Sequence, residues 1–374
     1  MTRTTRSWAY EARPQRVVTG RNAAGRLVKA ELDRLGARRI MLIAGKSELA
    51  TAQKLLGGMA AAATFTGVRP HVPVEVAEAA RACAAEAEAD ALLCVGGGST
   101  TGTAKAVALT TGLPIVAVPT TYAGSEATDV WGLTEGTRKT NGADPSVLPR
   151  AVVYDPELLV TLPPALTVNS GLNALAHCVD SLWAPNAGPV PTALATEGAR
   201  LLARGLTAVI ADATDLAALE ACQAGTYVAA AAFAAAGSGL HHKICHVLGG
   251  AYGLEHGAMH AVLLPHVLAF NEPAAPQAAA RIAEALAGAG YGDGSHALAA
   301  LLALHRALGA PTGLGALGLR ADQVSEAAEL VLEKVPATNP RPVTLPDLKA
   351  LLHRARTGAE PVRDHVGDST GETS

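Results

Sequence analysis

Histidines are concentrated in one short stretch of this 374-residue chain. Six of the twelve histidines lie between His241 and His266, within GSGLHHKICHVLGGAYGLEHGAMHAVLLPHVLAFN. His242 and His246 are spaced i, i+4, which places both on one face of a helix, and His256 follows after a glycine-rich stretch. Imidazole nitrogens bind metal ions and polar substrates, so this spacing predicts a shared site.

A second pair with the same spacing lies upstream, where Asn173 and His177 stand four residues apart in GLNALAHCVD. An aspartate at position 173, together with His177, His242 and His256, would supply one anion and three neutral nitrogens, a good ligand set for Zn²⁺ or Fe²⁺. The residue is asparagine, whose uncharged amide oxygen is a weak ligand for these cations. The sequence therefore predicts the spacing of a metal site without a tightly held metal.

Histidines on helices also serve as ordinary core or surface residues. We expect that structural role for His241, His260 and His266. The two spaced pairs are a different case, because two such pairs on separate segments seldom arise without a shared site. Cys245 lies among the histidines, so a catalytic or oxidation-sensitive thiol is an alternative there.

Two loops in the first half of the chain have the chemistry of a phosphate cradle. The apolar run 91–95 leads into GGGSTTGTAK, whose glycines let the backbone approach a pyrophosphate while the following helix favours its negative charge. The loop PTTYAGSE follows another apolar run, and open sheets bind ligands at the carboxyl ends of such strands. Together the loops predict a nicotinamide dinucleotide. GGGSTTGTAK departs from GxGxxG and from the Walker A motif, so a plain tight turn is the alternative.

The elements that position these residues change type half-way along the chain. Short apolar runs alternate with alanine-rich helical patterns in the first half, which predicts βαβ units and a parallel sheet, and after Leu162 the pattern is helical. We expect an α/β fold with a Rossmann-like dinucleotide domain over 1–160, an all-α substrate domain over 161–356 and a disordered tail over 357–374. The expected strands are 38–45, 91–99, 114–121 and 151–156, and the expected helices are 169–184, 192–211, 215–236 and 276–287.

Charge and composition argue against several classes of partner. The formal net charge is −3 and no long basic run occurs, so we expect neither a nucleic acid nor an anionic membrane as partner. The first residues lack the apolar region of a signal peptide, and no run of about 18 uninterrupted apolar residues occurs, which indicates a cytoplasmic protein. The five scattered cysteines lack CxxC spacing and fit reduced thiols in that compartment.

The combination of GGGS loop, PTT...GSE loop and paired-histidine helical half resembles the iron-containing alcohol dehydrogenase family, up to about residue 355. The motifs that carry the resemblance are WAYEARPQRVVTG, GGGSTTGTAKA, PTTYAGSEAT, GLNALAHCVDSLWAP and HHKICHVLGG...LEHGAMHAVLLPHVLAFN. Within that family they are most similar to the maleylacetate reductase branch, with Gly102 where alcohol dehydrogenases usually have aspartate. The resemblance implies a dehydroquinate synthase-like fold and a homodimer.

The resemblance also implies roles for individual residues. The family's catalytic histidine falls on His246, four residues beyond a metal position. The metal positions, without their usual aspartate, fall on Asn173, His177, His242 and His256. The implied cofactor contacts are Gly96, Gly97, Gly98, Ser99, Thr100, Thr120 and Thr121.

The reaction implied by the maleylacetate reductase branch is the NADH- or NADPH-dependent reduction of the C=C bond of maleylacetate, a small dicarboxylate, to 3-oxoadipate in the degradation of aromatic compounds. Hydride addition β to the ketone gives an enolate, whose spread charge hydrogen-bond donors can stabilise, so no tightly bound metal is expected. Our hypothesis is that His177, His242 and His256 bind the carboxylates or the enolate oxygen and that His246 donates the proton. Lys243 either adds positive charge or is merely solvated.

Three other functions are compatible with the sequence. The first is a metal-dependent alcohol or aldehyde oxidoreductase, in which Asn173 or water completes the coordination. The second is a dehydroquinate-synthase-like lyase, which would use NAD⁺ transiently and consume no NADH. The third is a nucleotide-binding protein without catalytic activity, which the joint occurrence of loops and histidines disfavours.

The chain is predicted to accept NADPH beside NADH. No acidic residue directly follows the strand that ends near Ala44, where Lys46 and Ser47 stand in place of the acid that usually holds a ribose 2′-OH. Steady-state kinetics with both cofactors test this. A preference for NADH in kcat/KM on the order of 100-fold or more would contradict it.

Overall fold

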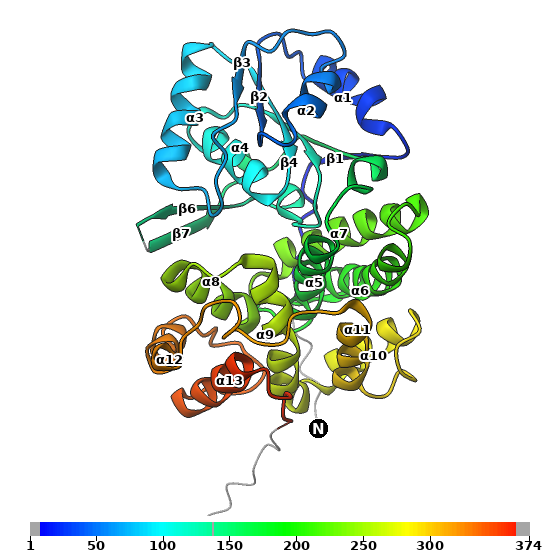
Figure 1. The fold of residues 1–374 in the computed structure, drawn as a ribbon, viewed down its shortest axis with the longest axis vertical. Coiled ribbons are helices and arrows are strands. Elements are labelled where there is room, and N and C mark those ends of the chain that lie inside the picture. Colours follow the sequence, from blue (N-terminus) through cyan, green and yellow to red (C-terminus); the bar gives the residue numbers. More distant parts are fainter. Residues whose placement is uncertain (1–7, 137, 364–374) are drawn as a thin grey trace, which may run out of the picture.

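A parallel sheet forms the centre of the N-terminal half (Figure 1). The computed structural model describes residues 8–136 and 138–363, and within these ranges six parallel strands lie in the order β1-β8-β5-β4-β2-β3. The central strands are buried along their whole length, as their unbroken apolar sequences require. The strands are β1 Arg16–Thr19, β2 Ile40–Ala44, β3 Ala63–Phe65, β4 Ala91–Gly96, β5 Ile115–Pro119 and β8 Ala151–Tyr154.

Helices cover both faces of this sheet (Figure 1). One apolar core lies between the sheet and the pair α1 (Ala23–Arg34) and α2 (Leu49–Leu55). A second core lies under α3 (Val74–Glu86) and α4 (Gly98–Thr111) on the opposite face. Because β4 and β5 are parallel neighbours, the loops that follow them leave the sheet at the same edge and side by side, with Gly96 paired to Pro119.

An antiparallel hairpin extends from the sheet half beside α8 (Figure 1). Its strands are β6 (Val130–Glu135) and β7 (Arg138–Ala143). The buried ammonium of Lys105 on α4 fixes the start of the hairpin, since it donates to the carbonyls of Thr128 and Val130 at 2.8 and 2.7 Å. Burial lowers the pKa of Lys105 to about 7. The three oxygen atoms that accept from its ammonium favour the charged form.

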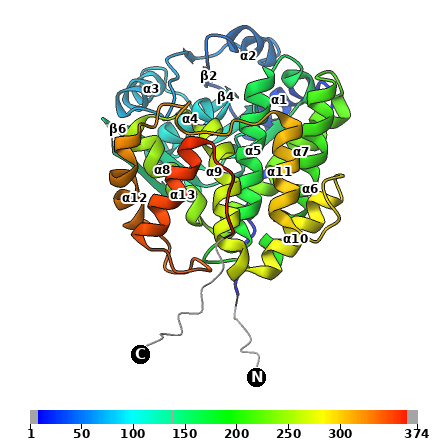
Figure 2. The same ribbon diagram turned by 60° about the horizontal axis from the view of Figure 1, so that its bottom comes forward.

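The rest of the chain is helical (Figure 2). Helices α5, α6 and α7 pack on one another, α8 and α9 form the next pair, and α12 and α13 cover that pair from outside. The bounds are α5 Pro164–Ser181, α6 Pro189–Ala211, α7 Leu216–Ala236, α8 Leu240–Tyr252, α9 His256–Asn271, α10 Pro276–Ala287, α11 Ala297–Leu308, α12 Val324–Leu332 and α13 Leu345–Thr357. Short 3-10 helices lie at Ser125–Ala127, Pro145–Val147, Pro156–Leu159, Glu272–Ala274 and Ala321–Gln323.

Among the described helices, α7 has the length and apolar composition that crossing a membrane requires. Half of its most apolar stretch is buried inside the protein, and core helices pass the same test, so this is weak evidence for a membrane span. Small residues suit this helix to its place between α5 and α6, because a side chain at Gly225 would lie 2.9 Å from Leu202.

The predicted fold class is confirmed: a parallel α/β sheet precedes an all-helical half. The prediction missed β1, β3 and the hairpin, which are short or polar and carry little apolar signal. The predicted start of α5, at residue 169, is too late, since the helix begins at Pro164. Proline usually ends a helix, but it is tolerated in the first helical turn. Residues 364–374 of the predicted tail lie outside the described residues.

Candidate functional site

The glycine-rich loop forms a tight cradle at the carboxyl end of β4. Gly96 has a φ of +152°, and a Cβ there would collide with Thr100, so only glycine fits. Gly97 caps α4, whose first N–H groups are directed at this edge of the sheet. Both properties are those of a pyrophosphate site.

The PTTYAGSE loop touches the glycine-rich loop on one side and α5 on the other. A Cβ on Gly97 would lie 3.0 Å from Thr121, and the Thr120 N–H donates to the Gly96 carbonyl at 3.1 Å. At its other end, Gly124 has a φ of +75° and lies against the ring of His177. The structure therefore brings the predicted cofactor loops next to the first predicted histidine.

Asp180 connects the two histidine-bearing segments. Its buried carboxylate accepts from the N–H of Gly239 at 2.9 Å, from the N–H of His242 at 3.3 Å and from Nδ1 of His242 at 2.8 Å. Trp183 Nε1 adds a fourth donor at 3.1 Å. Gly239 and His242 lie at the first turn of α8, so a carboxylate on α5 caps that helix and fixes the orientation of its histidine.

His177 and His242 stack on each other. Their ring centroids are 5.0 Å apart and nearly parallel, at 16°. Phe233 of α7 packs on both rings, at 4.8 and 4.3 Å. Nδ1 of His177, Nε2 of His242 and Oδ1 of Asn173 are buried and have no hydrogen-bond partner. These three atoms are available to a bound molecule.

A second row of side chains lies behind this pair. His260 packs 4.9 Å from His242 and 4.4 Å from His256, measured between ring centroids. Its Nδ1 lies 2.9 Å from Nε2 of His241, which also contacts the thiol of Cys245 at 3.7 Å. His241 and His260 are fully buried, as a structural role requires, but the contacts of His260 place it against the candidate site.

Besides the contact of Gly124 with His177, the sheet half touches the histidines through Asn141 and His71. Asn141 of β7 has its amide nitrogen 3.3 Å from Nδ1 of His246. His71, in the loop before α3, has its ring centroid 6.5 Å from that of His256, in an edge-to-face arrangement. The candidate site thus lies between the two halves of the chain.

Burial keeps the stacked histidines neutral. Burial, and then the neighbouring His242, lowers the pKa of His177 well below its usual range, and burial with His246 and Lys243 does the same for His242. A neutral His242 that donates Nδ1–H to Asp180 presents a lone pair at Nε2. In that state His242 accepts a hydrogen bond from a ligand rather than donating one.

Comparison with known proteins identifies the family. Residues 14–156 match the iron-containing alcohol dehydrogenase family, and residues 167–356 match its C-terminal part.

The chain belongs to the iron-containing alcohol dehydrogenase family.

The similarity extends over nearly the whole chain. Maleylacetate reductase from Burkholderia cepacia is 42% identical over 95% of this chain and 99% of its own length. A solved iron-containing alcohol dehydrogenase from Corynebacterium glutamicum is 48% identical, with a TM-score of 0.92 over 96% of this chain and 99% of that one. Maleylacetate reductase from Agrobacterium tumefaciens is 38% identical, with a TM-score of 0.88 over 96% of this chain and 100% of that one.

The family's metal positions lack their usual anion in this chain. Asn173 supplies no charge, and among the described residues His177, His242 and His256 do not form a group whose donor atoms all lie within 4.8 Å of one another. His241, Cys245 and His260 do form such a group, but the two imidazole nitrogens that face each other are already within hydrogen-bond distance. We therefore derive no reaction step through a metal.

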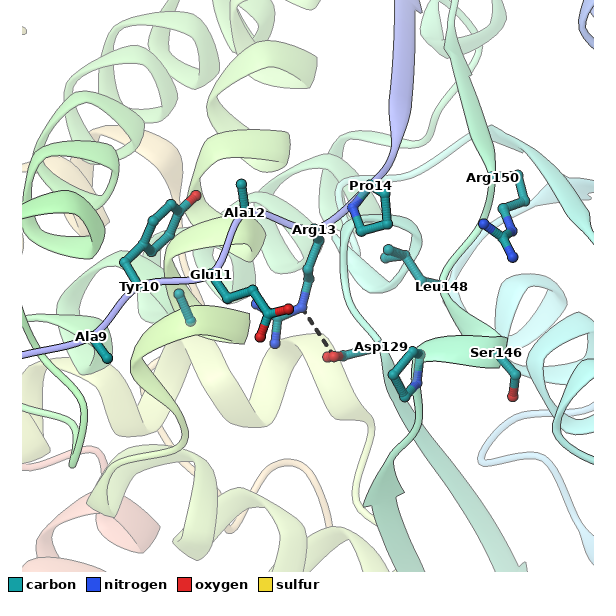
Figure 3. A pocket seen from close by; sticks show the side chains of 12 residues that line it. Ala9, Tyr10, Glu11, Ala12, Arg13, Pro14, Asp129, Ser146, Leu148 and Arg150 are labelled. Carbon is teal, nitrogen blue, oxygen red and sulfur yellow. Dashed lines mark ion pairs between the residues drawn. The ribbon is translucent and has the colours of Figure 1, made fainter.

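A pocket of about 370 Å³ lies away from the histidines, between the N-terminal segment and the loop before β8 (Figure 3). Arg13 crosses it to pair with Asp129 at 3.0 Å and to donate to the Ala234 carbonyl at 2.8 Å. None of the described histidines lines it. Through Arg13, the N-terminal segment that lines this pocket is attached to α7. The pocket is distinct from the candidate site.

Several residues of the site were missed by sequence reasoning. Asp180, Asn141, His71 and Phe233 have no motif of their own, although Asp180 at i+3 from His177 had the spacing of one helix face. Glu48 is a further residue without a sequence signal, and its carboxylate folds back on Gly45 just after β2. A carboxylate there accepts a hydrogen bond from a free ribose 2′-OH and repels a 2′-phosphate. This position of Glu48 is therefore an argument against the predicted acceptance of NADPH.

We predict that Gly124→Ala lowers NADH-dependent turnover by on the order of tenfold or more. The new Cβ would lie 2.8 Å from Ala230 and 3.3 Å from the ring of His177, which must then move. Gly112→Ala is the matched control, because Gly112 has a similar φ of +71° but no atom within 4 Å. Steady-state kinetics and thermal unfolding of both variants separate displacement of His177 from backbone strain. Equal loss of turnover in both would contradict the role of Gly124.

Proposed function

We propose that this protein is a maleylacetate reductase, which transfers hydride from a nicotinamide dinucleotide to the C=C bond of maleylacetate and forms 3-oxoadipate. Full-length similarity to named maleylacetate reductases supports the substrate, and the family supports the cofactor. The observation that carries the proposal is Asn173, because it removes the anion of the family's metal site while the surrounding histidines are kept.

The chemistry of the substrate explains why the anion can be lost. A simple carbonyl places all the developing charge on one oxygen, where a Lewis acid is effective. In maleylacetate the alkene is conjugated to the ketone, so hydride addition at the β carbon forms an enolate that spreads the charge. Neutral and cationic donors can then stabilise the transition state in a site shielded from water.

We assign proton donation to His246. Its ring is half-buried on α8, one turn beyond His242, and Nδ1 lies 3.3 Å from the amide of Asn141. It contacts the sheet half, where the cofactor loops lie. A histidine beside the bound substrate can protonate the carbon next to the ketone while hydride is delivered to the other alkene carbon.

The substrate oxygens are assigned to His177, His242 and His256, with Lys243 as the nearby cation. In the neutral imidazole of His242, Nε2 carries a lone pair and no proton. This ring therefore donates a hydrogen bond to the substrate only after it has taken up a proton. Asp180 stabilises the imidazolium formed in that way, as a buried carboxylate does for the histidine of a catalytic triad. The dianionic substrate supplies the opposite charge on the other side of the ring.

A metal-dependent alcohol or aldehyde dehydrogenase is the second candidate. The unpartnered buried atoms of Asn173, His177 and His242 favour it, since ligands of an absent ion would look the same. The lack of any negative charge among those three donors weighs against it.

We predict that the purified protein oxidises NADH with maleylacetate and that mass spectrometry identifies the product as 3-oxoadipate. His246→Ala should lower kcat by on the order of 100-fold or more, because the enolate loses its proton donor. His353→Ala, at an exposed position on α13, is the control. A His246→Ala enzyme with wild-type kcat would remove His246 from the mechanism, and a wild type without turnover would remove the proposed function.

A further inference from the structure

The loop that connects β3 to α3 carries an unusual backbone. His71 and Val72 are consecutive residues with φ values of +62° and +49°. Left-handed backbone is uncommon outside glycine and is an outlier for a β-branched residue such as valine. Strain of this kind persists only where the surroundings enforce it, and it concentrates at functional sites.

The surroundings of this loop do enforce it. The hydroxyl of Thr134 on β6 donates to the His71 carbonyl at 2.8 Å, and the Thr134 N–H donates to the Val72 carbonyl at 3.1 Å. Val72 is 5% exposed and packs over α4, where a Cβ on Gly102 would lie 2.8 Å from its side chain. The absence of a side chain at position 102 therefore leaves room for Val72, the chain neighbour of His71.

Held in this way, His71 faces the histidines of the other half. Its ring centroid lies 6.5 Å from that of His256, which is too far for the rings to hydrogen-bond directly. The separation suits one carboxylate that accepts from both rings, at about 2.7–2.9 Å each. His177, His242 and His256 all come from the helical half, so His71 supplies a donor from the opposite side.

We propose that His71 is a substrate-binding residue that sets specificity for a dicarboxylate by holding, with His256, one of the two carboxylates. This inference rests on the proposed function, which supplies a substrate with two carboxylates. It assigns the sheet half a role in substrate recognition besides cofactor binding.

The test compares His71→Asn with wild type on maleylacetate. Asparagine tolerates left-handed backbone, so the loop keeps its shape while the imidazole is removed. Loss of one hydrogen bond to a charged group predicts a KM about ten- to 100-fold higher, with kcat within a few-fold and NADH affinity unchanged. His353→Asn on the surface is the matched control.

Two truncated enones identify the contact. 4-Oxopent-2-enoate keeps the carboxylate on the alkene side, and 3-oxopent-4-enoate keeps the one beyond the ketone. The His71→Asn penalty in kcat/KM should persist with one of them and vanish with the other. A penalty that is equal for both, or absent with maleylacetate, overturns the inference.

Gly102→Ala provides a second variant that leaves His71 itself intact. The new methyl group would push Val72 and the loop, so it should raise KM in the same direction as His71→Asn. An unchanged KM in this variant, with a normal thermal unfolding temperature, counts against the inference. A wild type that fails to reduce maleylacetate instead overturns the proposed function, and with it the assignment of His71.

Discussion

The buried carboxylate of Asp180 is the interaction on which the site depends. It lies on α5, three residues after His177, and it caps the first turn of α8 through Gly239 and His242. Gly239 can approach because it has no Cβ, which would collide with the carboxylate. One side chain thus sets the distance between the two histidine segments and the tautomer of His242.

A second constraint joins the histidines to the cofactor loops. Gly124 packs on His177 at one end of the PTTYAGSE loop, and Thr121 touches Gly97 at the other. Movement of the nicotinamide site relative to His177 would therefore break contacts along a single rigid loop. Hydride transfer needs reacting atoms held within a fraction of an ångström, and this loop provides that coupling.

The sequence could predict the parts that have local signals. Buried strands such as β2 and β4 are visible in the sequence as apolar runs. The i, i+4 spacing of His242 and His246 places both residues on one face of a helix, whatever that helix packs against. Asn141, His71 and Asp180 could not be assigned in this way, because each acts through contacts with residues far away in the chain. The tautomer of His242 likewise depends on a tertiary hydrogen bond. Local pattern predicts elements, whereas the chemistry of a buried imidazole depends on what faces it.

We propose that conjugation in the substrate replaces the Lewis acid that the family's metal supplies. The direct measurement is NADH oxidation with maleylacetate by protein treated with a strong chelator, with the metal content of the same sample determined by elemental analysis. We expect full kcat at a metal content far below one ion per chain. Activity that disappears with the metal and returns on addition of Zn²⁺ or Fe²⁺ would contradict it.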